Sequence, residues 1–149
     1  MAVNMQQMLT AMDQAGLRMT RPRQALTVQV AAWASDGRDF TAEGLWHATH
    51  AQAPCVSRAT TFRTVEVLTE LGFLDRISFA DGTEHYHVVE PGTHHHHLTC
   101  EECHRVVAID ACMTPGQLAH VTLETGFTLS SHRVELFGRC PQCQAQQPV

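Results

Sequence analysis

The sequence predicts an α+β protein built in two parts. Residues 1–90 carry three helical patterns followed by a hairpin pattern, whereas residues 94–149 carry two CxxC pairs and short strands around one helix. The stretch at 91–93 separates the two parts, because proline and glycine break regular structure. We therefore expect a first domain at 1–90, a hinge at 91–93 and a second domain at 94–149.

The helices of the first part each follow a hydroxyl residue, whose oxygen can accept a hydrogen bond from a free N–H group of the first turn. The capping residues are Thr20, Thr41 and Ser57, and the helices that they open end near Ala34, His50 and Leu71. An alternating pattern at 73–79 and 84–89, around an Asp-Gly turn at 81–82, then predicts a β-hairpin. Three helices and a hairpin in this order predict a winged helix-turn-helix.

The second part has the pattern of a small α/β unit. Strands are expected at 98–100, 105–109 and 128–137, with a helix at 114–125 between the last two. Thr114 followed by Pro115 opens this helix, and Gly126 closes it.

The overall charge gives no general indication of a nucleic-acid partner. The ten positive charges are all arginine and stand against fifteen acidic residues, for a net charge of −5. Phosphate affinity normally comes from a basic surface, so DNA binding would depend on a local arginine set that a symmetric dimer brings together twice. No apolar run is long enough to span a bilayer, and residues 1–16 lack an export pattern. We expect a cytoplasmic protein with reduced cysteines and no membrane partner.

Four of the six cysteines form two CxxC pairs. Each pair places two thiolates across a tight turn, and two such turns complete a tetrahedral cage. A redox CxxC motif needs only one pair, so we interpret the set as a structural zinc site, made by Cys100, Cys103, Cys140 and Cys143. Cys55 is expected to be a buried free thiol. Cys112 is expected to be a free surface or buried cysteine, with a stray ligand or an oxidation-sensitive thiol as the alternative.

The helix that begins after Ser57 carries an aromatic side chain away from its apolar stripe. At 100° per residue, Val65 and Leu68 face the core, whereas Phe62 and Arg63 face outward. An exposed Phe beside an Arg suits a recognition helix in the major groove, although an ordinary amphipathic helix packed on another element would also explain it. Arginines at 18–23 could follow the DNA backbone or enter the minor groove. The candidate DNA-contacting residues are Arg18, Arg21, Arg23, Ser57, Thr60, Thr61, Phe62 and Arg63.

Four consecutive histidines at 94–97 lie between the hairpin and the first CxxC pair. In an extended chain alternate residues face opposite sides, so His94 and His96 form one pair and His95 and His97 another. Imidazole is the commonest metal-ligating side chain, so two metal sites are expected, and a solvated polar hinge is the plain alternative. Imidazole with a carboxylate suits Zn²⁺, Fe²⁺, Ni²⁺ and, less well, Mn²⁺.

Four motifs together, TRPR at 20–23, ATTFR at 59–63, HHHHLTCEEC at 94–103 and GRCPQC at 138–143, resemble the ferric uptake regulator family of bacterial metal-responsive repressors. The resemblance covers about residues 10–143. It implies a homodimer formed through the second domain and a structural zinc on the paired cysteines. It also implies a regulatory divalent metal at the hinge, which closes the first domains onto a palindromic operator in double-stranded DNA.

On the family pattern, the regulatory metal would be held by His87, His95 and His97 with Asp39 or Asp75. His87 occupies the position of a glutamate in iron-type members, and Asp39 occupies the position of a histidine in many members. The ligand set therefore has the same imidazole and carboxylate types, with these two positions exchanged. Zinc-type members place a cysteine where this chain has Val89, while Asp75 matches their aspartate. The regulatory ion is therefore Fe²⁺, Mn²⁺ or Zn²⁺ on this pattern.

A further, weaker metal site is implied in the second domain, with ligands His94, His96 and His132. The glutamate that usually completes it aligns with Pro115, which leaves Asp110 or Gln117 as substitutes. Ala108 replaces the acidic ligand of peroxide-sensing relatives, which argues against oxidation of a bound iron as the signal.

The resemblance implies a metal-dependent, DNA-binding transcriptional repressor of metal-uptake or homeostasis genes, responsive to iron or manganese, and not an enzyme. A zinc-responsive uptake regulator of the same family is the alternative. A metal-storage protein and a zinc hydrolase are the other classes considered. A hydrolase would leave one metal position open for water, but the sequence has no HExxH motif and no evident nucleophile beside the histidines.

Overall fold

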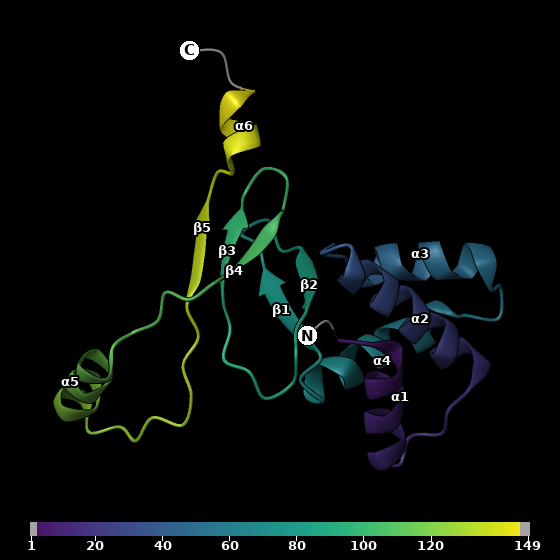
Figure 1. Ribbon diagram of the computed structural model, residues 1–149, viewed down its shortest axis with the longest axis horizontal. Coiled ribbons are helices and arrows are strands. Elements are labelled where there is room, and N and C mark those ends of the chain that lie inside the picture. Colours follow the sequence, from purple (N-terminus) through teal and green to yellow (C-terminus); the bar gives the residue numbers. More distant parts are fainter. Residues whose placement is uncertain (1–2, 147–149) are drawn as a thin grey trace. The chain divides into compact units, whose positions relative to one another are not determined.

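The computed structural model describes residues 3–146, which form two compact units that divide between Thr93 and His94 (Figure 1). The outermost residues of the expected domains, 1–2 and 147–149, lie outside the described part of the chain. The first unit contains α1 (Met5–Gln14), α2 (Arg21–Ser35), α3 (Ala42–Gln52), α4 (Arg58–Glu70), β1 (Leu74–Ser78) and β2 (Glu84–Val88). The second contains β3 (His96–Cys100), β4 (Val106–Ile109), α5 (Pro115–Thr125), β5 (Glu135–Gly138) and α6 (Pro141–Ala145). The α+β class expected from the sequence is confirmed.

The three expected helix caps of the first unit are present. The hydroxyl oxygens of Thr20, Thr41 and Ser57 each accept a hydrogen bond from the backbone N–H group three residues later. Each cap satisfies a donor that has no partner within its helix, so α2, α3 and α4 begin where the sequence places them.

Helix α1 was not expected from the sequence. The Asn4 side chain accepts from the Gln7 N–H group, and the Gln7 side chain accepts in return from the Asn4 N–H group, which together make a capping box. Met8 and Met12, one helical turn apart, are fully buried against the core of the first unit. The helix is therefore an integral part of this core.

The hairpin of β1 and β2 is tied to the segment before α3 by one isolated bridge. Phe40 and Tyr86 exchange two backbone hydrogen bonds, with N···O distances of 3.2 and 2.7 Å, and their rings stack with centroids 5.9 Å apart. Because side chains alternate along an extended chain, the neighbouring residues Asp39 and His87 are brought together on the other side of this bridge.

The second unit is a three-stranded sheet in the order β4-β3-β5, with β3 antiparallel to β4 and parallel to β5. The parallel pairing requires a long connection, which contains α5. Helix α5 begins at the expected Thr114 cap and ends at Gly126, whose left-handed φ of +71° favours glycine. Strand β5 is shorter than expected, because only four of its residues find partners on β3. Figure 1 shows α5 at the end of two extended connections, and none of its residues is buried.

Among residues 3–146, the structure contains no helix with both the length and the apolar character needed to cross a bilayer.

Candidate metal sites and nucleic-acid interface

The four paired cysteines converge at one end of the second unit. Their sulfur atoms all lie within 4.8 Å of one another, and the Cys103 and Cys140 sulfurs are 3.7 Å apart. A disulfide would hold two sulfurs at about 2.05 Å, whereas a tetrahedral zinc with Zn–S bonds of about 2.3 Å separates them by roughly 3.8 Å. The spacing fits a shared zinc ion and no disulfide.

Backbone N–H groups stabilise thiolates in this cluster, and thiolates favour binding of a cation. Hydrogen bonds from the N–H groups of Cys103 and then Cys140 lower the pKa of Cys100 to about 6. The pKa of Cys140 is also lowered, chiefly by the Cys143 N–H group, whereas the hydrogen bond to Cys140 and burial raise the pKa of Cys143 to about 12. Four adjacent thiolates need a compensating charge, and a divalent ion supplies it. Four sulfurs leave no open position for a reactant, so the site is structural.

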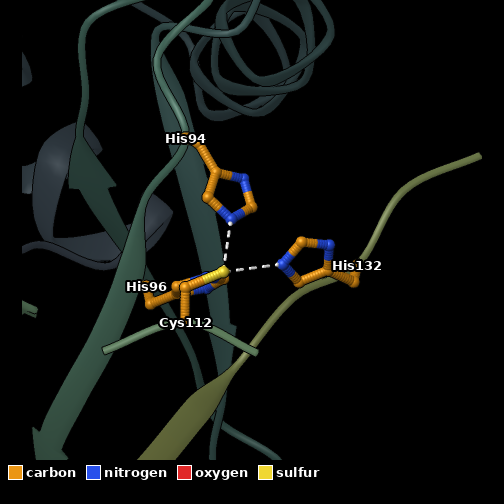
Figure 2. Close-up of side chains that lie close together, drawn as sticks. All are labelled: His94, His96, Cys112 and His132. Atoms are coloured by element: carbon orange, nitrogen blue, oxygen red, sulfur yellow. Dashed lines mark hydrogen bonds between the residues drawn. The ribbon is translucent and has the colours of Figure 1, made fainter. Parts of the chain in front are cut away.

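A second cluster lies elsewhere in the same unit and contains His94, His96, Cys112 and His132, whose ligand atoms are all within 4.8 Å of one another (Figure 2). The Cys112 sulfur is 3.4 Å from Nε2 of His94 and 3.1 Å from Nε2 of His132. The residues come from the start of β3, from the segment after β4 and from the segment before β5. The three histidines expected in the further site are thus brought together.

The fourth member of this cluster differs from both substitutes considered on the sequence. Asp110 does not belong to it, and Cys112 is its fourth member instead. The side-chain oxygen of Gln117 is occupied in the α5 cap, where it accepts from the Thr114 N–H group at 2.8 Å. Cys112 is a free, exposed cysteine, as expected, and its sulfur lies against two imidazoles, which favours the alternative of an additional ligand. No spacing rule pointed to Cys112, since it is 18 and 20 residues away from these histidines. Cys55, which was expected to be buried, is exposed.

His96 is the buried member of the cluster, with 1% of its surface exposed. Its Nδ1 accepts a hydrogen bond from the Val134 N–H group at 3.1 Å, and within the described chain its Nε2 is buried with no hydrogen-bond partner. Burial first, and then the neighbouring imidazoles of His94 and His132, lower the pKa of His96. The ring is therefore held neutral, the form that a metal ligand requires.

The carboxylate of Asp39 and the imidazole of His87 form a third group, in the first unit. Their Oδ1 and Nδ1 atoms are 2.5 Å apart, and only 8% and 18% of the two side chains are exposed. Asp75 is the register partner of His87 across β1 and β2, so the two residues share one face of the hairpin. The structure thus places three of the five expected regulatory ligands near one another in this unit.

The other two expected regulatory ligands, His95 and His97, belong to the second unit. Their ring centroids are 6.5 Å apart, whereas the rings of His94 and His96 approach to 4.3 Å. The expected alternation along the histidine run is confirmed, because the two pairs separate into different groups. The five expected ligands are therefore divided between the two units of the chain.

Helix α4 presents the expected outward-facing pair. Phe62 is 37% exposed and Arg63 is exposed. The Arg58 guanidinium lies 4.6 Å from the Phe62 ring centroid and also donates from Nε to Oε2 of Glu43 on α3 at 2.8 Å. This contact links the two helices and fixes one side of the aromatic ring.

Thr61 is a correction to the expected DNA-contacting set. It is fully buried and its hydroxyl donates to the Ser57 carbonyl, so its side chain belongs to the core. The Ser57 and Thr60 hydroxyls are bonded to each other at 2.9 Å in the α4 cap. Of the N-terminal arginines, Arg18 and Arg21 are exposed, whereas Arg23 donates from Nη1 to the Arg18 carbonyl at 2.6 Å.

The comparison with protein families matches residues 14–137 to the model described as "Ferric uptake regulator family". The chain is 30% identical over 128 residues to the ferric uptake regulation protein of Bacillus subtilis, with 85% of each chain covered. Its fold resembles that of the Helicobacter pylori ferric uptake regulator, described with three functional metal binding sites, at a TM-score of 0.70 and 18% identity, covering 96% and 95% of the two chains. It also resembles a zinc uptake regulator complexed with zinc and DNA, at a TM-score of 0.69 and 19% identity, covering 95% and 93%.

Proposed function

Because the chain belongs to the ferric uptake regulator family, we propose that it is a metal-dependent transcriptional repressor that binds double-stranded DNA and controls genes for metal uptake or homeostasis. Members of this family are transcription regulators and not enzymes. The observation that carries the proposal is the family match over 14–137, which covers the winged helix and the first CxxC pair, Cys100 and Cys103. As a regulator of transcription, the protein acts in the cytoplasm.

The DNA-binding surface in this proposal is the outer face of α4 together with the arginines before α2. Arg63 bonds phosphate or guanine, and Phe62 contacts a thymine methyl group. Within the described chain, Arg18, Arg21 and Arg63 have no ion pair or hydrogen bond from their side chains, which supports their availability to DNA. The net charge of −5 predicts steep salt dependence, since only this local set attracts the duplex.

The regulatory ion in this proposal is bound by His87, His95 and His97 with Asp39 or Asp75. Imidazole and carboxylate donors fit Fe²⁺ and Mn²⁺ as well as Zn²⁺. A ligand shifts a conformational equilibrium only through its differential affinity for the two states. Ligands drawn from both units give the ion such a differential affinity. The DNA-bound arrangement is therefore favoured by the metal.

The proposed repressor is a homodimer that binds a palindromic operator. Val107, Leu98 and Leu136 are register partners across β4, β3 and β5, and between 41% and 49% of each side chain is exposed. On and after α5, Leu123 and Phe127 are 84% and 73% exposed. Apolar surface of this extent is typical of a protein interface, and a second copy of the second unit is its proposed partner.

The test begins with selection of duplexes from a random-sequence pool by the metal-loaded protein. The selected duplex is then labelled, and its fluorescence anisotropy is followed with chelated protein and after separate addition of Mn²⁺, Fe²⁺ and Zn²⁺, with metal content counted. We expect one of these ions to restore binding while one tightly held zinc per chain remains on the cysteines. Restoration by Zn²⁺ alone at low free concentration would identify the zinc-responsive alternative.

A matched pair of variants separates the regulatory site from general effects. His95→Ala is expected to abolish metal-dependent DNA binding and leave the cysteine-bound zinc and the dimer intact. His120→Ala removes an exposed histidine of α5, which pairs with Glu124 at 3.3 Å and belongs to neither metal-ligand cluster of the described residues, and should respond as the parent does. Failure to select any duplex with an intact, metal-loaded dimer would contradict the proposed function.

A further inference from the structure

The cluster of His94, His96, Cys112 and His132 contains a donor that the regulatory set lacks, the sulfur of Cys112. In a tetrahedral zinc site, bonds of about 2.3 Å to sulfur and about 2.05 Å to nitrogen place the two donors roughly 3.5 Å apart. The observed distances from the Cys112 sulfur, 3.4 Å to His94 and 3.1 Å to His132, are close to this value. The side chains are thus already spaced to share one ion (Figure 2).

The donor chemistry of the cluster is that of a borderline-soft ion. Among the four members there are three imidazoles and one thiol, and no carboxylate. Thiolate and imidazole favour Zn²⁺, whereas Mn²⁺ prefers carboxylate, carbonyl and water oxygens. The pair of Asp39 and His87 in the first unit differs in its donors, because a carboxylate oxygen, and no sulfur, lies 2.5 Å from the imidazole.

Exposure is graded across the cluster in a way that suits a bound ion. His94 and Cys112 are exposed and His132 is half-buried, so an ion can enter from solvent. His96 lies behind them, 1% exposed, with a buried Nε2 that has no hydrogen-bond partner within the described chain. A buried polar atom without a partner is costly, and an ion bound by this ring would remove that cost.

We propose that Cys112 completes the further metal site implied with His94, His96 and His132, and that its thiolate makes this site select Zn²⁺ over Mn²⁺ and Fe²⁺. On binding, the thiol loses its proton to solvent and the sulfur bonds the ion together with Nε2 of His94 and of His132. His96 supplies the third nitrogen and thus the fourth ligand, for which it must either give up the hydrogen bond from Val134 or lose its Nε2 proton. The contribution of His96 is therefore smaller than that of Cys112. This assignment needs neither DNA nor the regulatory ligands.

Cobalt is the probe, because a thiolate bonded to Co²⁺ gives a near-ultraviolet charge-transfer band that imidazole and carboxylate do not give. The full-length protein, kept reduced, anaerobic and with zinc on its paired cysteines, is titrated with Co²⁺. The expected result is a band with the intensity of one sulfur–cobalt bond per chain. Zn²⁺ should remove the band at one equivalent, whereas a hundredfold excess of Mn²⁺ or Fe²⁺ should leave it.

Two cysteine variants provide the matched comparison. Cys112→Ser should abolish the band and weaken zinc binding at this site at least about 100-fold, more than the loss of a ligand's supporting partner does. Cys55→Ser, the other unpaired exposed cysteine, should leave band and affinity unchanged. Cobalt exchange into the four-cysteine cage would give a stronger band that persists in Cys112→Ser. That persistence would overturn the proposal, as would absence of the band in the parent protein.

Histidine variants test the rest of the ligand set. His132→Ala should remove the band as Cys112→Ser does, and His120→Ala should retain it. His96→Ala should weaken cobalt affinity by less than His132→Ala, and an unchanged affinity would exclude His96 as the fourth ligand. Retention of the cysteine-bound zinc and of the circular dichroism spectrum establishes that each variant is folded. Displacement of Co²⁺ by equimolar Mn²⁺ would contradict the proposed selectivity.

Discussion

The Nδ1 atom of His87 lies 2.5 Å from the Oδ1 atom of Asp39, although 48 residues separate the two in the sequence. The contact exists because the backbone bridge between Phe40 and Tyr86 ties the hairpin to the segment before α3. A carboxylate on Nδ1 fixes the orientation and tautomer of an imidazole, so that Nε2 is the ring atom that a metal would bind. In the proposed regulatory site, Asp39 would therefore act on the metal through His87 without itself bonding it.

This relationship predicts different losses at the two positions. His87→Ala removes a proposed ligand and should raise the metal concentration needed for half-maximal DNA binding by more than 100-fold, whereas Asp39→Asn should raise it by about 10- to 100-fold. DNA anisotropy during metal titration measures both. Asp36→Asn, on the exposed turn after α2, is the control. Equal losses in His87→Ala and Asp39→Asn would show that Asp39 bonds the ion directly.

Loss of the cysteine cage should unfold the second unit. Cys100→Ser removes a thiolate whose pKa is already lowered to about 6, and the bound zinc stabilises only the folded state. A ligand present at a thousand times its dissociation constant contributes about 4 kcal/mol, which corresponds to a melting temperature lower by roughly 15 °C or more for a unit of this size. Differential scanning calorimetry with metal counting measures the effect.

Cys55→Ser is the control for this experiment, because Cys55 is exposed in the first unit. It should melt within about a degree of the parent, since surface substitutions usually change stability by less than about 0.5 kcal/mol. A Cys100→Ser variant with the parent's melting temperature and oligomeric state would refute a structural role for zinc.

Arg63 should contribute to operator binding through one contact. Arg63→Ala is expected to weaken the complex by about 1–3 kcal/mol, which is roughly 5- to 150-fold, and to reduce the salt slope by about one if the contact is to phosphate. Anisotropy at several salt concentrations gives both quantities. Arg38→Gln removes a charge that lies 4.8 Å from the Trp33 ring, in the segment between α2 and α3, and should leave the slope unchanged. If Arg63→Ala bound DNA with the affinity and salt slope of the parent, α4 would not be the recognition element.

Helix α1 should contribute directly to the stability of the first unit. Met8→Ala empties a fully buried position and should cost about 2–5 kcal/mol of unfolding free energy. Met5→Ala, at a position 36% exposed on the same helix, should cost less than about 1 kcal/mol. Urea unfolding followed by tryptophan fluorescence measures both, because Trp33 lies in the same core. Similar costs at both positions would show that α1 is not docked in solution.

Local rules predicted most of the first unit. Thr20, Thr41 and Ser57 act as caps where they were expected, because capping depends on residues only three positions apart. The same rule would have found α1, since Asn4 and Gln7 have the capping-box spacing.

Features that depend on residues far apart in the sequence could not be predicted from capping and turn patterns. Strand β5 was expected to begin at Thr128, yet pairing begins at Glu135, because its length is set by the partners available on β3. Cys112 reaches His94 and His132 only through the fold of the segments around β4 and β5. The four-cysteine cage was predictable because each CxxC turn supplies half of the geometry locally.

The parallel pairing of β3 with β5 imposes an order in time on the formation of the cage. Cys140 follows Cys103 by 37 residues, so at 5–20 residues per second a ribosome makes the second half of the cage roughly 2–7 s after the first. Every core residue of the first unit has been synthesised before then. The nascent chain thus acquires its DNA-binding fold first, and the supply of zinc acts on a molecule whose winged helix has already been made.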